Sequence, residues 1–199
     1  DIPGQDHAGP EQIVMDLHDI CIDPDIVIGD RSPRRIVMRG FFQQADKYVP
    51  HQNLIRSWLR GICPDVPYQC NTLGIHLRIY DYSANGWALP VSYYKEAINR
   101  VLALCNPERI YIFTDETRLL PGHIPFIMNL PQVNVHRGSD IEAFALMRSC
   151  DRLIIANSSF SWWPAFLEDH QQVIMPWNWQ PWGKGQPGDR INPAGHLYA

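Results

Sequence analysis

The chain has 199 residues, of which 45% are hydrophobic and 19% are charged, a composition that is typical of a globular protein. The formal net charge of -4 and the lack of an extended Lys/Arg cluster exclude a basic face for nucleic acid. No apolar run approaches the roughly 20 residues that a membrane span needs, so membrane association is expected only through segments outside this sequence.

The five cysteines are scattered and include no C-x-x-C pair, so their spacing does not favour a zinc site. Reduced thiols in a cytoplasmic protein and one or two disulfides in a lumenal protein both fit this pattern. No signal peptide is visible, and the chain opens at Asp1 rather than at Met. We therefore expect a processed or truncated piece.

Residues 1–70 are punctuated by proline and glycine and are predicted to form an irregular N-terminal extension. Within this region a strand is expected over 36–42 and a helix over 47–59, where apolar residues recur at helical spacing. The extension is interpreted as a remnant of, or a linker to, a second half of the protein.

From residue 71 onward, predicted strands and helices alternate. The strands are expected over 72–79, 109–114, 133–136, 151–157 and 173–177, and the helices over 91–105, 139–148 and 158–170. A capping box opens the second helix, because Ser139 and Glu142 can satisfy each other's groups in its first turn. This alternation predicts an α/β fold, a Rossmann-like parallel sheet with helices on both faces, over residues 71–199.

Polar side chains follow three of these strands, at the edge where parallel sheets bind ligands. They are His76, Arg78 and Asp81, then Thr114, Asp115 and Glu116, and finally Asn157, Ser158 and Ser159. An arginine fork suits a phosphate or diphosphate, and a helix that opens after the third strand offers free N–H groups to an anion. The sequence therefore predicts an anion site at this edge.

Each of these features also has a purely structural interpretation. Residues 157–159 suit a capped strand-to-helix turn, and Asp81 and Asp115 are available as ion-pair partners of Arg78. Asp115 and Glu116 also suit helix N-caps. The adjacent residues 162–163, both tryptophan, fit either a packed wall or a surface that faces a sugar.

Three common loop signatures are absent from the sequence. There is no G-x-G-x-x-G, no G-x-x-x-x-G-K-[ST] and no G-x-S-x-G, which argues against a dinucleotide-binding enzyme, a P-loop NTPase and an α/β-hydrolase. An anion site without these loops favours a nucleotide sugar or a similar diphosphate ligand.

Several motifs resemble those of the α-1,2-fucosyltransferase family. GIHLRIYDY at 74–82 resembles its basic H-x-R-x-x-D donor motif, and YIFTDE at 111–116 resembles its serine/threonine-acid-acid motif. NSSFSWW at 157–163 and VIMPWNW at 173–179 resemble its asparagine-serine-phenylalanine-serine-tryptophan-tryptophan motif and the segment that follows. With GFFQ at 40–43, order and spacing agree from about residue 36 to residue 179.

The resemblance implies the donor-binding half of a GT-B glycosyltransferase. Such an enzyme transfers fucose from GDP-fucose to a galactose hydroxyl of a glycan, with α-1,2 linkage and inversion, and needs neither a metal nor a cofactor. Arg78, with Asp81 or Asp115 as general base, is the implied catalytic set, although no pattern chooses between the two acids. The implied donor-binding residues are His76, Arg78, Thr114, Asp115, Glu116, Asn157, Ser158, Ser159 and Phe160.

Two departures from the family pattern modify this expectation. Ile79 stands where the family usually has a second arginine, and loss of a buried charged bond to a diphosphate costs about 1.5–3 kcal/mol. The glycine-rich half that precedes the donor motifs in the family does not occur in this sequence. We therefore expect the 199-residue chain to bind GDP weakly and to transfer no fucose by itself.

Two other functions fit the sequence. One is a non-catalytic relative that binds a nucleotide or glycan, and the other is an interaction domain that uses Trp177, Trp179 and Trp182 against a partner. The expected location is cytoplasmic or membrane-peripheral in a bacterium, and the Golgi lumen in a eukaryote.

Overall fold

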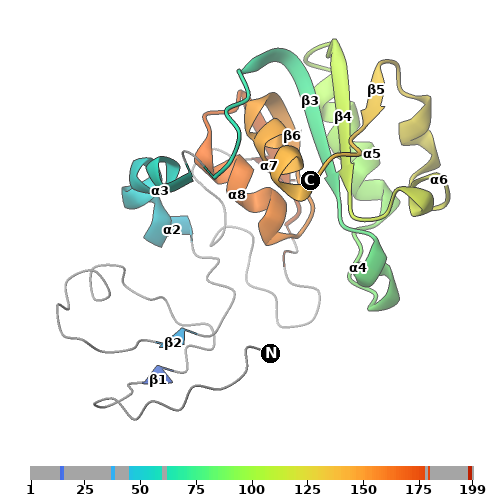
Figure 1. Cartoon of the computed structure of the whole chain (residues 1–199). Coiled ribbons are helices and arrows are strands. Elements are labelled where there is room, and N and C mark those ends of the chain that lie inside the picture. Colours follow the sequence, from blue (N-terminus) through green and yellow to red (C-terminus); the bar gives the residue numbers. More distant parts are fainter. Residues whose placement is uncertain are drawn as a thin grey trace.

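The fold is built on a parallel β-sheet whose strands run in the order β5-β4-β3-β6-β7-β8. The computed structural model describes residues 14–15, 37–38, 45–59, 62–177, 179 and 197–198 (Figure 1). The strands of this sheet are β3 (Gln69–Leu77), β4 (Arg109–Thr114), β5 (Val133–Val135), β6 (Cys150–Ile154), β7 (Gln172–Met175) and β8 (Leu197–Tyr198).

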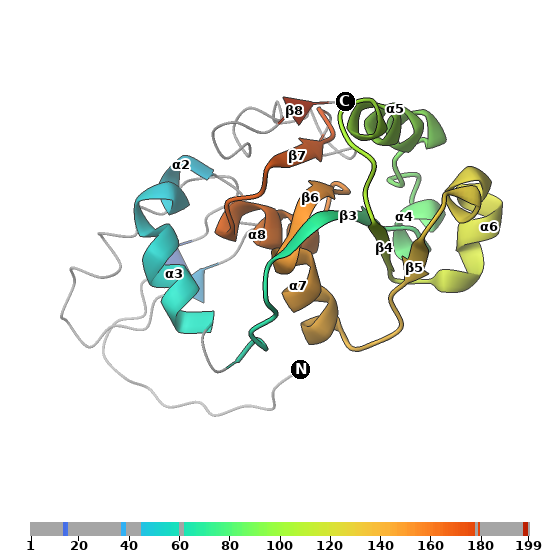
Figure 2. The same ribbon diagram turned by 90° about the horizontal axis from the view of Figure 1, so that it is seen from above.

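Helices cover both faces of the sheet, as Figure 2 shows. The alternation of side chains along β3 explains this arrangement, because successive residues point to opposite faces. Leu73, Ile75 and Leu77 are fully buried in one apolar cluster with α5 (Val91–Leu102). The other face packs against helices α7 (Asp140–Ser149) and α8 (Ser159–Leu167).

The predicted parallel α/β sheet with helices on both faces is therefore confirmed. β4 has the predicted bounds, and the other strands and helices of this region lie within a few residues of theirs. The capping box also forms, since Ser139 N donates to Glu142 Oε2 at 2.7 Å and Glu142 N donates to Ser139 Oγ at 3.3 Å. The hydrogen bonds that Ser139 N and Ser139 Oγ donate to Glu142 Oε2 lower the pKa of Glu142.

The structure also contains short helices between the strands that the sequence does not predict. They are α4 (Tyr80–Ala84), the 3-10 turn η2 (Thr117–Leu119), α6 (Leu120–His123) and the 3-10 turn η3 (Pro125–Asn129). Each has five residues or fewer, so none shows a helical period in its apolar residues. The longer helices end earlier than predicted, at Leu102 and Leu167 instead of residues 105 and 170.

Part of the predicted N-terminal extension packs against this domain. It forms α2 (Ala45–Tyr48), a 3-10 turn η1 (Val49–His51) and α3 (Gln52–Leu59). From α3, Gln52 Nε2 donates to Phe166 O and Arg56 Nε donates to Leu167 O, so α3 satisfies carbonyls at the end of α8. The predicted domain boundary near residue 70 stays a prediction; β3 begins at Gln69.

The remaining described part of the extension is a short parallel pair, β1 (Val14–Met15) with β2 (Val37–Met38). β2 lies inside the strand predicted over 36–42, and the rest of that strand lies outside the described residues. The four described cysteines are free thiols, while Cys21 lies outside the described part. Among the described residues, every helix is too short or too polar to cross a bilayer.

Gly74 of β3 leaves room for side chains of the neighbouring strands β4 and β6, and a substitution there tests this packing. A Cβ added there would lie 2.6 Å from Leu153 Cδ2 and 3.2 Å from Cys150 Sγ. Gly74→Ala is therefore expected to lower the free energy of unfolding by about 1–3 kcal/mol, as overpacking of a rigid core does. Urea unfolding measures this change.

Gly122→Ala is the matched control, because a Cβ at that position meets no atom within 4 Å. Its unfolding free energy should equal that of the wild type or exceed it by up to about 1 kcal/mol, because alanine replaces a helical glycine without a clash. Equal stability of the two variants would contradict the close packing of β3 against β6.

Candidate functional site

The three polar strand ends predicted from the sequence meet at one edge of the sheet. β3 pairs with β4 on one side and with β6 on the other, all in parallel, so their carboxyl ends are neighbours. Arg78 follows β3, Asp115 follows β4, and the segment 155–159 follows β6. We call this place the carboxyl edge.

Arg78 pairs with Asp81 and Asp115, the two carboxylates that the sequence offers as its ion-pair partners. Its Nη2 donates to Asp81 Oδ2 at 3.1 Å, and its Nε lies 3.0 Å from Asp81 Oδ1 and 3.4 Å from Asp115 Oδ2. The guanidinium carbon also lies 5.6 Å from the centre of the Tyr82 ring, within the range of a cation–π contact. The side chain of Arg78 remains 35% exposed.

The Asp115 carboxylate fixes the turn that follows β3. It accepts hydrogen bonds from the backbone N–H of Ile79 at 2.9 Å and of Tyr80 at 3.2 Å, where α4 begins. Its side chain is only 15% exposed. Because Asp115 is committed to these two donors, it acts as a structural cap and as an orienting group for Arg78.

The neighbours of Asp115 also have local partners. Thr114 Oγ1 accepts from Glu116 N at 3.3 Å, and Glu116 Oε1 accepts from Arg118 N at 3.0 Å, which caps η2. Asp115 and Glu116 therefore both accept hydrogen bonds from backbone N–H groups at helix starts, which is the capping role that the sequence suggests. Whether Thr114 and Glu116 contact a donor stays a prediction.

Three buried polar atoms at the carboxyl edge lack a hydrogen-bond partner in the described structure, and one of them, Asp81 Oδ1, lies in ion-pair contact with Arg78. The other two are His76 Nδ1 and Asn157 Oδ1, in side chains that are 4% and 2% exposed. Buried polar groups in native proteins are nearly always paired, and leaving one unpaired is costly. Such atoms at the ends of adjacent strands indicate that a ligand or ordered water completes the site.

The His76 side chain lies on the same face as the Phe160 ring of α8, at 5.6 Å between ring centres. Two effects lower the pKa of His76 to about 3: burial, which is the larger, and the positive charge of Arg78. The imidazole is therefore neutral near pH 7 and offers one donor and one acceptor to a ligand.

The third strand end forms the capped turn that the sequence suggests. Ser158 Oγ accepts from Phe160 N at 3.3 Å and so caps α8, and the Ser158 side chain is largely buried. Ser159, by contrast, is exposed at the start of the helix. A helix start with an exposed serine faces the same edge as Arg78, and its contact with an anion stays a prediction.

The paired tryptophans form a packed wall. Trp162 is 1% exposed and stacks on Phe166 with ring centres 4.9 Å apart and an interplanar angle of 6°. Trp163 meets Trp162 edge to face at 4.9 Å, and Tyr48 of α2 packs on Trp163 at 5.1 Å. This wall joins α8 to the N-terminal helices.

The sequence reading missed how α4 and the loop after it connect the strand ends. Tyr82 OH donates to Asn157 O at 3.2 Å, and Asn157 Nδ2 donates to Trp87 O at 3.2 Å. The Tyr82 and Trp87 rings meet edge to face at 5.8 Å. The signal in the sequence was Tyr82 directly after the H-x-R-x-x-D segment, with Trp87 five residues further along.

Ile79, in the position of the expected second arginine, is a core residue. Its side chain is 1% exposed and belongs to the cluster on the α5 face, so it does not compensate for the missing cation. A hollow of about 270 Å³ adjoins this position and is lined by Ile79, Ser83, Arg118, Leu119, Gly122 and His123.

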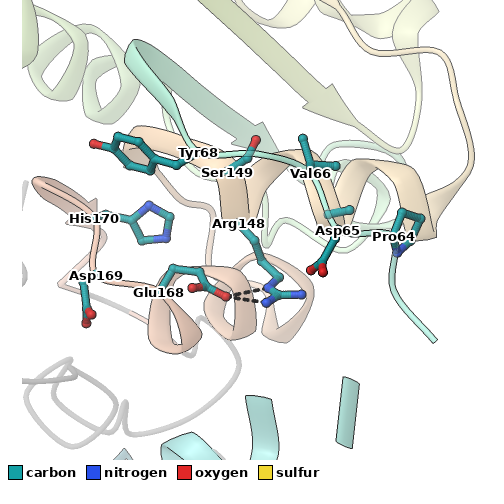
Figure 3. A pocket seen from close by; sticks show the side chains of 10 residues that line it. Pro64, Asp65, Val66, Tyr68, Arg148, Ser149, Glu168, Asp169 and His170 are labelled. Carbon is teal, nitrogen blue, oxygen red and sulfur yellow. Dashed lines mark hydrogen bonds and ion pairs between the residues drawn. The ribbon is translucent and has the colours of Figure 1, made fainter. Parts of the chain in front are cut away.

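A second cavity of about 330 Å³ lies at the opposite edge, where β6 begins (Figure 3). Arg148 and Glu168 face each other there in an ion pair of 2.6 Å. The His170 ring lies between two carbonyl oxygens, with Nδ1 2.7 Å from Cys150 O and Nε2 3.0 Å from Pro164 O. Because these groups are already paired within the protein, the cavity lacks the unpartnered atoms that mark the carboxyl edge.

Comparison with protein families gives a match over most of the chain. The model described as glycosyl transferase family 11 matches residues 37–181.

Similar curated proteins are also known. One is an O-antigen biosynthesis glycosyltransferase, WbnK, of Escherichia coli, 29% identical over 165 residues that cover 70% of this chain and 54% of that protein. Another is an alpha-1,2-colitosyltransferase of Escherichia coli, 27% identical over 158 residues with the same coverage of 70% and 54%. The chain thus spans about half the length of these relatives.

Among solved structures, the chain is similar to a NodZ alpha-1,6-fucosyltransferase crystal soaked with GDP-fucose. The TM-score is 0.35 and the identity 16%, over 60% of this chain and 42% of that chain.

The buried His76 predicts a specific pH dependence of stability. Its pKa in the folded protein, about 3, lies below the ordinary value of 6.5, so between these values the unfolded state binds a proton that the folded state does not. Stability is therefore lost as the pH falls below about 6.5. His76 should contribute a loss of about 2 kcal/mol in unfolding free energy between pH 7 and pH 5.

The test compares urea unfolding of the wild type and His76→Gln at these two pH values. The variant should show a clearly smaller loss, while His51→Gln, which changes a partly exposed histidine, should keep the wild-type dependence. An unchanged pH dependence in His76→Gln would show that the buried imidazole is not the cause.

Proposed function

The chain belongs to glycosyl transferase family 11, and from this premise we propose that it forms the donor-binding part of a fucosyltransferase. The proposed reaction transfers fucose from GDP-fucose to a galactose hydroxyl of a glycan acceptor. The linkage is α-1,2, and the configuration at the anomeric carbon is inverted. The proposal concerns the whole protein, because this chain spans about half of the relatives that it matches.

One observation carries the proposal, namely the group of unsatisfied atoms beside a cation at the carboxyl edge. Arg78 is one-third exposed and next in sequence to the buried strand that bears His76. His76 Nδ1 and Asn157 Oδ1 are buried and unpartnered. Together they offer positive charge and hydrogen-bonding atoms in the place where open parallel sheets bind nucleotides. These positions also carry the motif resemblance.

The chemistry that these residues can perform follows from the charges that develop in the reaction. As the bond between the anomeric carbon and the phosphate oxygen breaks, negative charge grows on the GDP leaving group. Arg78 stabilises that charge through its fork, and the positive end of the α8 helix dipole adds to this stabilisation.

The acceptor hydroxyl must lose a proton as its oxygen bonds to the anomeric carbon. Asp81 is the better candidate for the base, because its side chain is 42% exposed, whereas Asp115 is bound by two backbone N–H groups. His76 remains neutral and serves as a hydrogen-bonding group.

Two alternatives are separated by the same experiments. The similarity to a protein named as a colitosyltransferase favours a different donor sugar as the second candidate. The buried Ile79 favours a nucleotide-binding relative without transfer activity. Assays of GDP-fucose and GDP-colitose with a galactoside acceptor, by product mass, separate the three. Binding of GDP by the whole protein without any product would support the non-catalytic alternative.

Arg78→Ala should reduce the affinity for GDP by about tenfold or more, since a charged hydrogen bond to phosphate is worth about 1.5–3 kcal/mol. Isothermal titration calorimetry with GDP measures this loss. The melting temperature should change little, because Arg78 is partly exposed and lies outside the core.

Arg100→Ala is the control, since Arg100 forms an exposed pair with Glu96 on α5. It should bind GDP as the wild type does. If Arg78→Ala binds GDP as tightly as this control, Arg78 serves only as a structural ion-pair partner.

We also propose that donor binding requires no divalent metal. The described residues include no cluster of three or more His, Cys, Asp or Glu that is arranged to hold a metal ion. GDP affinity should therefore be the same in EDTA as in Mg²⁺ or Mn²⁺, within about twofold. Binding that collapses in EDTA and returns with either ion would contradict a metal-independent transfer.

A further inference from the structure

Resting on the proposed function, we infer that Asp81 is an exchangeable counter-ion of Arg78. In the empty site its carboxylate occupies the guanidinium fork, and the diphosphate of the donor displaces it. Displacement frees the Asp81 carboxylate for the acceptor hydroxyl, so the base becomes available only after the donor has bound.

The contact between Asp81 and Arg78 is incomplete, which makes exchange favourable. One hydrogen bond joins Nη2 to Oδ2 at 3.1 Å. Asp81 Oδ1 lies 3.0 Å from Nε but is buried without a hydrogen bond, so this second contact is a close approach of charges with poor alignment. A phosphate that offers two well-aligned oxygens makes the two parallel bonds that the fork prefers.

Arg78 does not need Asp81 to keep its place. Asp115 stays beside Nε at 3.4 Å and is itself fixed by the N–H groups of Ile79 and Tyr80. The Tyr82 ring lies against the guanidinium, and its hydroxyl is tied to Asn157 O. Asp115 is therefore the permanent partner, and Asp81 is the partner that can leave.

The exposure of the two acids supports the same division of roles. The Asp81 side chain is 42% exposed and the Asp115 side chain is 15% exposed. When Asp81 rotates away from the fork, its carboxylate enters solvent, and the hydration that it gains offsets the loss of the ion pair. Ile79 is buried in the core and supplies no second cation, so the donor and Asp81 compete for one fork.

The freed carboxylate then completes a balanced transfer step. The acceptor oxygen forms a bond to the anomeric carbon as the bond from that carbon to the phosphate oxygen breaks. The electron pair of the broken bond leaves with GDP, and the acceptor proton moves to an Asp81 oxygen. This sequence predicts that the donor binds before the acceptor.

Two isosteric variants, Asp81→Asn and Asp115→Asn, distinguish a carboxylate that the diphosphate displaces from one that holds Arg78 in position. Asp81→Asn should bind GDP and inorganic pyrophosphate about two- to fivefold more tightly than the wild type, the range expected from removing a competing surface ion pair. Asp115→Asn should bind both more weakly, because Arg78 loses its fixed partner. Glu108→Gln removes one negative charge at the far end of β4 and should change neither affinity.

Calorimetry with GDP and with pyrophosphate is the first measurement, and melting temperatures verify folding. In transfer assays of the whole protein, Asp81→Asn should lower both the KM for the donor and kcat, a combination that loss of structure does not produce. If Asp115→Asn does not fold, the affinities of Asp81→Asn and Glu108→Gln for GDP and pyrophosphate still show whether Asp81 competes with the ligand.

The outcomes distinguish this inference from the proposed function. If the wild type binds GDP and Asp81→Asn binds it equally or more weakly, exchange is wrong while the proposed function stands. If Asp81→Asn gains affinity for pyrophosphate but no variant binds GDP, exchange is supported and the nucleotide-sugar function fails. Absence of binding of either probe to every variant overturns both.

Discussion

The arrangement of the carboxyl edge depends on the two backbone hydrogen bonds that Asp115 accepts. The first N–H groups of a helix have no partner inside the helix, and here the carboxylate at the end of β4 receives those of Ile79 and Tyr80. This contact sets where α4 begins after β3. Tyr82, one turn further, is thereby brought to Asn157 beyond β6. One carboxylate thus links three strand ends and aims Arg78 at the space in front of them.

The two edges of the sheet differ in how many of their buried polar atoms lack a partner. At the far edge, Arg148 pairs with Glu168 and the His170 ring lies between two carbonyl oxygens, while Gln172 Oε1 at the start of β7 is buried without a partner. At the carboxyl edge, His76 and Asn157 each keep a buried atom without a partner, although both side chains are more than nine-tenths buried. Unpaired groups of this kind lower the free energy of unfolding. Their place beside the partly exposed Arg78 supports the proposal that a ligand binds there and pairs with them.

The sequence predicts β3, β4, β6 and β7 because each contains a buried, mainly apolar run bounded by polar or turn residues. The strand at 109–114 is matched at both ends for this reason. α4 is missed because its start is fixed by Asp115, which lies more than thirty residues further along the chain. The spacing of His76 and Arg78 predicts that they share a face. It does not predict that Phe160 of α8 covers the imidazole and leaves the arginine open.

The alternation of side chains along β3 explains why position 79 supplies no second cation at the carboxyl edge. Residues 74 and 76 face the α7 and α8 layer, while 73, 75, 77 and 79 face the α5 layer, so Ile79 continues the core pattern of the strand. An arginine at position 79 would need to leave that core or bend round the strand end to reach an anion. With isoleucine there, the core gains a well-packed side chain. Arg78 is then left facing two carboxylates, Asp115, which is fixed by backbone N–H groups, and Asp81; under the exchange that we infer, the balance between Asp81 and a bound phosphate sets the affinity of the site.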